Sequence, residues 1–283
     1  MTEKDAKKRL GLVLGGGGAR GLAHIGVLKV LEKAGISVDL VAGTSMGAVL
    51  GAFYLAGVTA ERMETEALRR SKLTEITKLI DIFPTPAPRL LKGQRISDLL
   101  NATLGVNFKF ADLRGPLAVV VVDMNTGREV VIKEGNVVEA LRGTISVPGV
   151  FAALGAGEMR MVDGGVLNNV PVDVAREMGA ECVVAVDVIP NFGVNVPGEP
   201  PVVPPLRPSR APRIYTDLWH VQLVMVSALT DFHLRLSPPD VLIRPELPTD
   251  MDLFIGFHRP KDAIEAGERA TEAALPQILD LLS

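Results

Sequence analysis

The sequence has little of the material on which several protein classes depend. Its 283 residues include one cysteine, Cys182, and four histidines. These numbers exclude an intramolecular disulfide framework and leave little for a structural zinc site. The 30 Lys and Arg residues do not outnumber the 33 Asp and Glu residues, so the basic surplus of a general nucleic-acid-binding protein is missing. A single cysteine also suits a reducing compartment, so we expect a cytoplasmic protein.

The pattern of a membrane-spanning helix is missing as well. The longest uncharged stretch, residues 40–60, contains Gly43, Gly47, Gly51 and Gly57, whereas a spanning helix is richer in large apolar residues. Residues 1–9 carry charges of both signs and precede an interrupted apolar run, which is unlike a signal peptide. We expect a soluble protein, and peripheral contact with a membrane stays open.

The elements that the sequence does indicate alternate between strands and helices. Apolar runs and helical spacing predict a strand, helix, strand and helix at residues 10–14, 22–34, 38–42 and 46–56. Further strands are predicted at 117–122, 129–132, 158–162, 182–188 and 241–244, the second forming a hairpin with the first across residues 125–127. Further helices are predicted at 59–78, 137–145, 172–178, 215–236 and 260–282. This order predicts a three-layer α/β/α sandwich around a mainly parallel sheet.

Two proline-rich segments interrupt this order. Residues 82–92 read as an exposed loop, and residues 190–212 hold eight of the chain's 20 prolines. A stretch of that length without regular structure is typical of a movable cover over a site. We interpret residues 1–283 as one domain, with a core at about 9–188, a proline-rich excursion at 190–213, and C-terminal helices and a strand at 215–283.

The first motif with chemical meaning is Gly43-Thr44-Ser45-Met46-Gly47, between a predicted strand and a predicted helix. This is the setting of a nucleophile elbow, in which flanking glycines let the backbone turn tightly around the serine. Its hydroxyl then lies at a helix N-terminus, where the dipole favours developing negative charge. We favour a nucleophilic Ser45 over a simple packing turn with a capping serine.

The second motif is the run of residues 15–21, which contains Gly16, Gly18 and Gly21 at the spacing of a dinucleotide fingerprint. A nucleotide-binding regulatory protein is therefore the main rival interpretation. Asp39, the acid at about the right distance, opens the second strand, whereas a ribose-binding acid belongs at that strand's carboxyl end. Backbone amides of such a loop can equally bind an oxyanion, and we favour that function because Ser45 lies at the same sheet edge.

A serine nucleophile needs a base, and the residues alone leave its identity open. His24 lies in the first helix, where packing against the sheet is the better interpretation. His258 would complete an α/β-hydrolase order, but those enzymes carry more strands before the nucleophile than this chain does. Among carboxylates, Asp123 and Asp187 each follow a buried strand, and Asp163 opens an Asp-Gly-Gly turn.

Taken together, these motifs resemble a known family. Residues 16–21 (GGGARG), 43–47 (GTSMG) and 163–165 (DGG) look like the three signature motifs of patatin-like phospholipases, in the family's order. The segments 146–151 (SVPGVF) and 167–171 (LNNVP) also look like bacterial members. The likeness covers roughly residues 9–188. One departure is Ala152-Ala153, where relatives often have prolines, so the acyl-chain preference stays open.

The resemblance implies a site and an activity. Ser45 would be the nucleophile and Asp163 its base, without a histidine. Gly16, Gly17 and Gly18 would form the oxyanion hole, supported by Arg20 and Gly21, and Gly43 and Gly47 would shape the elbow. The implied activity is that of a serine acyl hydrolase on lipid esters, with no cofactor. A non-catalytic lipid-binding member of the family is the further alternative.

The predicted helix at 215–236 carries two apolar stripes. The first contains Leu218, Val221, Met225, Leu229 and Phe232, and the second contains Trp219, Leu223 and Val226. One stripe is enough to dock a helix on a sheet. The other is expected to meet the core, a second subunit of a homodimer, or a bilayer surface, and Trp219 is the residue through which we would test lipid contact.

Overall fold

The computed structural model describes residues 8–72, 74–75, 91–190, 213–251 and 255–283. Its strands are β1 (Leu10–Leu14), β2 (Leu40–Thr44), β3 (Leu117–Asp123), β4 (Arg128–Ile132), β5 (Leu154–Ala156), β6 (Met159–Asp163), β7 (Cys182–Val186) and β8 (Val241–Ile243). They form an eight-stranded sheet in the order β5-β6-β3-β2-β1-β7-β8, with β4 paired to β3 off this path. The pairs among β3, β2, β1, β7 and β8 are parallel, and β4, β5 and β6 pair antiparallel.

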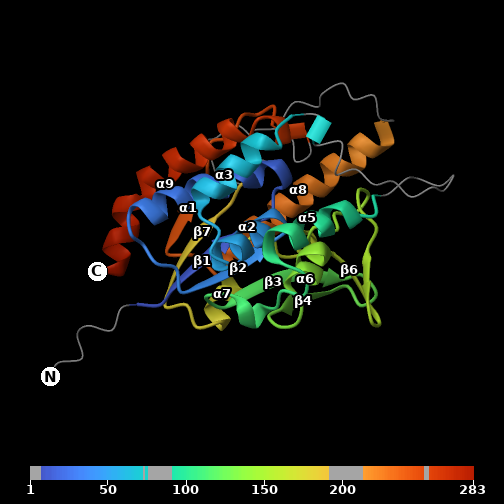
Figure 1. Ribbon diagram of the computed structural model, residues 1–283, viewed down its shortest axis with the longest axis horizontal. Coiled ribbons are helices and arrows are strands. Elements are labelled where there is room, and N and C mark those ends of the chain that lie inside the picture. Colours follow the sequence, from blue (N-terminus) through green and yellow to red (C-terminus); the bar gives the residue numbers. More distant parts are fainter. Residues whose placement is uncertain (1–7, 73, 76–90, 191–212, 252–254) are drawn as a thin grey trace.

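Helices cover the sheet on both faces (Figure 1). They are α1 (Ala23–Lys33), α2 (Met46–Leu55), α3 (Ala60–Arg69), α5 (Gln94–Leu104), α6 (Val137–Thr144), α7 (Val172–Glu177), α8 (Arg213–Leu236) and α9 (Pro260–Leu282). Alternate strand residues point to opposite faces. Leu12 and Leu14 pack in the cluster that holds residues of α1, α2, α6 and α9, whereas Val13 packs with residues of α7 and with Leu234 of α8. The predicted α/β class with a mainly parallel central sheet between helical layers is confirmed.

The strands are continuous apolar runs because they are buried on both faces. All residues of β1, β2, β3 and β7 are buried. Polar side chains therefore come where the strands end, and the carboxyl ends of β1, β2 and β7 meet at one edge of the sheet because the three are parallel. The opposite edge holds Asp39, whose Oδ2 accepts a hydrogen bond from the Leu10 N–H at 2.7 Å.

Some boundaries differ from the sequence-based expectations. The helix predicted at 59–78 ends at Arg69, its first turn capped by the Thr59 side chain accepting from the Arg62 N–H; of its remainder, residues 73 and 76–78 lie outside the described residues. The strand predicted at 182–188 ends at Val186, and α5 and β5 were not predicted. Only Leu100 of α5 is buried, although Ile96, Leu99, Leu100 and Leu104 recur at helical spacing. Both proline-rich segments lie almost entirely outside the described residues.

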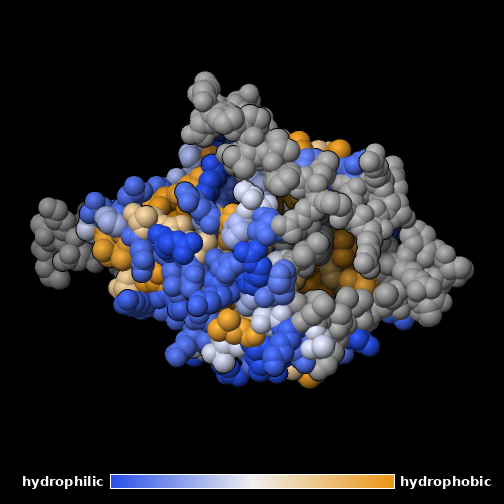
Figure 2. Space-filling model, turned by 90° about the horizontal axis from the view of Figure 1, so that it is seen from above, coloured by the Kyte–Doolittle hydropathy of each residue, from blue (hydrophilic) through white to orange (hydrophobic). Residues whose placement is uncertain are grey.

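Seen from above, hydrophilic and hydrophobic residues are unevenly distributed over the described surface (Figure 2). Hydrophilic residues cover most of the middle of the view, and hydrophobic residues form the floor of a hollow on its right. No helix among the described residues combines the length and the apolar character needed to cross a membrane.

Candidate active site

The site is built where two strands meet end to end beside β3. Strand β2 pairs with residues 117–120 of β3 and stops at Thr44, opposite Val120. Strand β6 runs the other way and stops at Asp163, opposite Val121. Because β4 occupies the other side of β3 at residues 119–123, β6 must lie on the side of β2. The residues that follow β2 and end β6 are therefore neighbours, although Ser45 and Asp163 are far apart in the sequence.

Ser45 is held in a sharp turn between β2 and α2. Its φ of 51° and ψ of −126° belong to a backbone region that non-glycine residues rarely adopt, which stores strain of about 1–3 kcal/mol. The turn is tight on both sides of the serine. A Cβ on Gly43 would approach the Ala48 backbone N to 2.7 Å, and a Cβ on Gly47 would collide with the Leu14 carbonyl. Both positions therefore require glycine.

Thr144, at the end of α6, fixes this turn through two hydrogen bonds. Its Oγ1 accepts a hydrogen bond from the Ser45 N–H at 2.9 Å and donates one to the Val120 carbonyl at 2.5 Å. Val120 lies at the point where β2 has ended, so the threonine satisfies a carbonyl of β3 and the amide of the serine together. The sequence analysis missed this residue, because a lone threonine at a helix end has no distinctive pattern.

Asp163 is buried beside Ser45. Its Oδ1 accepts the Gly165 N–H at 2.8 Å. Burial raises the pKa of Asp163 to about 6, and hydrogen bonds from the Ser45 hydroxyl and the Gly165 amide oppose that rise. The carboxyl group is therefore ionised near neutral pH, shares a cavity lining with Ser45, and has a proton affinity suited to a base.

The glycine-rich loop after β1 crosses above Ser45. The Gly15 N–H donates to the Val186 carbonyl at 3.0 Å, and the Gly16 N–H donates to the Asn169 carbonyl at 3.2 Å. The Asn169 side chain returns a bond from Nδ2 to the Gly16 carbonyl at 3.2 Å, so it ties this loop to the segment that follows Asp163. A Cβ on Gly16 would lie 3.1 Å from the Ser45 Cβ and 2.6 Å from Asn169 Oδ1. Among the described residues, no protein acceptor is recorded for the amides of Gly17 and Gly18.

Two buried side chains support this loop. Arg20 donates from Nε to the Val188 carbonyl at 2.7 Å and from Nη1 to the Met251 carbonyl at 3.1 Å, so it joins the loop to the segments after β7 and β8. Gly21 packs directly on Met46, whose Cβ would lie 2.8 Å from an added Cβ. The Nε2 atom of His24 lies 2.7 Å from the carbonyl oxygen of Gly15. Burial lowers the pKa of His24 to about 4, although the hydrogen bond to Gly15 opposes this, so the ring is neutral and donates to that carbonyl.

The other carboxylates that the sequence analysis considered have structural partners. Asp123 accepts hydrogen bonds from the backbone N–H groups of Asn125 and Arg160, both at 3.1 Å, and these bonds lower its pKa. Asp187 forms an ion pair with Arg244 at 3.1 Å. Neither lines the cavity at Ser45, and no histidine among the described residues does.

A cavity of about 60 Å³ contains the candidate residues. The glycine loop, Ser45, Asp163, Gly165 and Asn169 line one part of it. Helix α8 lines the rest with Trp219, Gln222, Leu223 and Val226. The structure thus brings Gly16, Gly17 and Gly18 together with Ser45 and Asp163, while Arg20, Gly21, Gly43 and Gly47 lie behind this lining.

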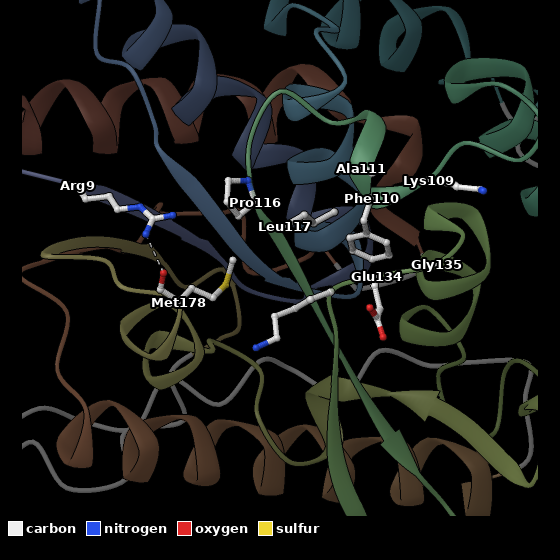
Figure 3. A pocket seen from close by; sticks show the side chains of 10 residues that line it. Arg9, Lys109, Phe110, Ala111, Pro116, Leu117, Glu134, Gly135 and Met178 are labelled. Carbon is white, nitrogen blue, oxygen red and sulfur yellow. Dashed lines mark hydrogen bonds between the residues drawn. The ribbon is translucent and has the colours of Figure 1, made fainter.

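A larger pocket of about 490 Å³ lies at the opposite edge of the sheet, where β1 and β3 begin (Figure 3). Arg9 reaches across it and donates from Nη1 to the Met178 carbonyl at 3.1 Å. The described lining residues include none of the candidate catalytic groups. No group of three or more His, Cys, Asp or Glu side chains that could hold a metal ion occurs within the described ranges.

Comparisons with known proteins identify the family of the chain. A family model described as patatin-like phospholipase matches residues 12–176. An uncharacterized NTE family protein of Mycobacterium tuberculosis is 31% identical over 293 residues, covering 100% of this chain and 49% of that protein. The human patatin-like phospholipase domain-containing protein 6 is 37% identical over 183 residues, covering 63% of this chain and 13% of that protein. The chain thus spans about half the length, or less, of these relatives.

A solved structure has a similar fold. VipD from Legionella pneumophila superposes with a TM-score of 0.59 at 14% identity, covering 96% of this chain and 67% of that chain. At this identity the likeness concerns the fold alone. The family model, in contrast, extends over more than half of this chain, including the glycine loop, Ser45 and Asp163, and the chain therefore belongs to the patatin-like phospholipase family.

Proposed function

We propose that the protein is a serine acyl hydrolase that cleaves acyl esters of lipids with Ser45 as nucleophile and Asp163 as base. The observation that carries the proposal is that the strained Ser45 turn and the buried Asp163 carboxyl, at the meeting ends of β2 and β6, line one cavity beneath the glycine loop. The family description names phospholipases, which supports lipid esters as the substrate class.

The chemistry would proceed in two steps. Ser45 attacks the ester carbonyl while Asp163 takes the hydroxyl proton, and the alcohol leaves after protonation by the same acid. Water then attacks the acyl-serine, with Asp163 accepting a proton from it, and the fatty acid is released. With a pKa of about 6, Asp163 is largely ionised at pH 7 and can still return the proton.

The oxyanion of each tetrahedral intermediate would be stabilised by the glycine loop. The Gly16 N–H already donates to the Asn169 carbonyl, so we assign the oxyanion donors to Gly17 and Gly18, with Gly16 setting the distance between the loop and Ser45. Such preorganised amides contribute several kcal/mol to acyl transfer. Arg20 acts on this step as a positioning residue, because its Nε and Nη1 donate to backbone carbonyls of the segments that hold the loop.

The geometry disfavours a nucleotide-binding regulatory protein. Asp39, the acid that would bind a ribose, bonds to the Leu10 N–H at the opposite edge of the sheet.

The test combines covalent labelling with two substrates. A fluorophosphonate probe should label the wild-type protein at Ser45 and should not label Ser45→Ala. Both Ser45→Ala and Asp163→Asn should lower kcat/KM on a short soluble ester by about 10³-fold or more, and the double variant little further, because the pair acts as a unit. The pH profile of kcat/KM for the wild type should rise through pH 6. Near-normal turnover in Asp163→Asn would refute the dyad, and binding of phospholipid without labelling would favour the non-catalytic alternative.

A further inference from the structure

The two apolar stripes of α8 have different surroundings. Trp219, Leu223 and Val226 line the cavity over Ser45, so the expectation that Trp219 could meet a bilayer is not supported by its position. The opposite stripe faces outward. Four of its five members, Leu218, Val221, Met225 and Phe232, are 61%, 54%, 58% and 56% exposed, and Leu229 is half-buried. The spacing of the four exposed members, three, four and seven residues, keeps them on one face of the helix.

The two halves of α8 also differ in how firmly they are held. In the C-terminal half, Val226, Ser227, Thr230 and Leu234 are buried, and Asp231 pairs with Arg244 at 3.0 Å. From Asp217 to Met225, in contrast, no residue is buried. A segment with so little burial opens at a lower free energy than the core, and this is the half that covers Ser45 with Trp219 and Leu223.

The space beneath this half is too small for a lipid acyl chain. The cavity has a volume of about 60 Å³, well below the roughly 300 Å³ at which pockets for drug-sized ligands begin. If the proposed function is right, the space over Ser45 must widen before an acyl chain enters, and the N-terminal half of α8 is a weakly buried part of its wall. A partner favours that movement only if it binds the moved helix more tightly than the closed one, which a lipid surface does because the moved helix offers it more apolar area.

We propose that the outer stripe of α8 docks on a lipid surface of zwitterionic character and that this contact moves the N-terminal half of α8 away from Ser45. The proposal rests on the proposed function, because the substrate itself would be part of that surface. The stripe holds four exposed, large apolar side chains and no basic residue, so it fits an interface entered by apolar contact rather than one recognised through anionic headgroups. Binding should therefore depend little on salt or on anionic lipid.

The chain provides its own reporter for this movement. Trp219 is its one tryptophan and lies on the inner face of α8, in the cavity lining. Its fluorescence emission should change when phosphatidylcholine vesicles are added to the Ser45→Ala protein, which leaves the lipid intact.

The test compares a stripe variant, Leu218→Asp with Val221→Asp, with the control Val106→Asp. Val106 is 77% exposed in the turn after α5, so the control removes a comparable apolar side chain from another part of the surface. The stripe variant should bind phosphatidylcholine vesicles about tenfold or more weakly, hydrolyse vesicle lipid correspondingly more slowly, and lose the Trp219 emission change. On a short soluble ester, all three proteins should differ by less than about twofold. The control should behave as the wild type in every assay.

Several outcomes would overturn the proposal. One is unchanged vesicle binding by the stripe variant, and another is an equal loss by the control. Conversion of a dimer to a monomer by the stripe variant, seen by light scattering, would identify the stripe as a subunit interface. A thermal melt checks folding, and Val221→Thr, which keeps the shape of the side chain, replaces the double variant if that variant is unfolded. Failure of the wild type on both esters would refute the proposed function, while vesicle binding and the Trp219 signal would still test the docking surface.

Discussion

Replacing Asp163 with asparagine should stabilise the protein while abolishing its activity. The carboxyl group has a pKa of about 6 in the folded protein against an ordinary value of 3.8. At 1.36 kcal/mol for each pH unit, this difference corresponds to about 3 kcal/mol. Because the folded-state pKa is raised, the acid contributes stability that is complete below pH 3.8 and is lost as the pH rises through 6. At pH 7.5 the buried carboxylate therefore destabilises the fold, and Asp163→Asn removes that charge with little change in shape.

The titration of His24 also changes the stability of the protein with pH, in the direction opposite to that of Asp163. Its pKa falls from 6.5 to about 4 in the folded protein, so its contribution to stability is complete above pH 6.5 and is lost as the pH falls to 4. This loss is also about 3 kcal/mol, and over the same interval it opposes the gain from Asp163. The two groups should nearly cancel in the wild type, whereas Asp163→Asn exposes the His24 effect alone.

The assay is urea unfolding, followed by circular dichroism at intervals from pH 4 to 7.5. Asp163→Asn should have a free energy of unfolding about 3 kcal/mol above that of the wild type at pH 7.5, and the difference should vanish near pH 4. Asp123→Asn is the control, since hydrogen bonds lower the pKa of Asp123 and its loss should destabilise the protein at neutral pH. An Asp163→Asn protein that is no more stable than the wild type at pH 7.5 would refute the claim that the ionised, buried Asp163 lowers the free energy of unfolding.

Three further predictions concern the residues around this pair. Ser45→Gly should be more stable than Ser45→Ala by about 1 kcal/mol in thermal or urea unfolding, because only glycine relieves the strained backbone; equal stability would contradict the strain. Thr144→Val should lower the free energy of unfolding by about 2–4 kcal/mol, since it leaves the Ser45 N–H and the Val120 carbonyl unpaired, and should lower kcat more than Thr144→Ser does. Arg20→Lys should reduce kcat more than it raises KM, because an ammonium cannot reproduce the fork that bonds two separate carbonyls; unchanged constants would make Arg20 a structural residue only.

The elements around Ser45 could be predicted because their signals are local. The apolar runs of β1 and β2 and the glycines around Ser45 lie within the first 60 residues. The local sequence of each segment is enough to predict its conformation. The alternation of strands and helices then implies parallel pairing, which brings the glycine loop and the elbow to one edge. From those steps alone, the serine and the loop can be joined into one candidate site.

The position of Asp163 could not be predicted in the same way. Its closeness to Ser45 depends on β6 running antiparallel to β3 and continuing the line of β2, and nothing in the local sequence specifies that arrangement. Only the resemblance to a family singled out this aspartate. Thr144 and Asn169 were missed as supports for the same reason, since their roles come from contacts with distant backbone groups. The orientation of α8 was likewise undecided, because both stripes are apolar and tertiary packing selects the inner one.

The proposed dyad requires a carboxylate alone to serve as the base, and the burial of Asp163 offers a physical reason why it could. A serine nucleophile usually relies on a histidine whose pKa is already near neutrality, whereas the pKa of a solvated aspartate is too low for that role. Burial at the junction of β2 and β6 raises the pKa of Asp163 to about 6, which brings the carboxylate into the useful range without a third group. The same burial leaves no room for a substrate, because α8 completes the apolar surroundings. If Asp163 is the base, the burial that raises its pKa also narrows the site, so an opening of α8 that admits a substrate has to leave Asp163 away from bulk water.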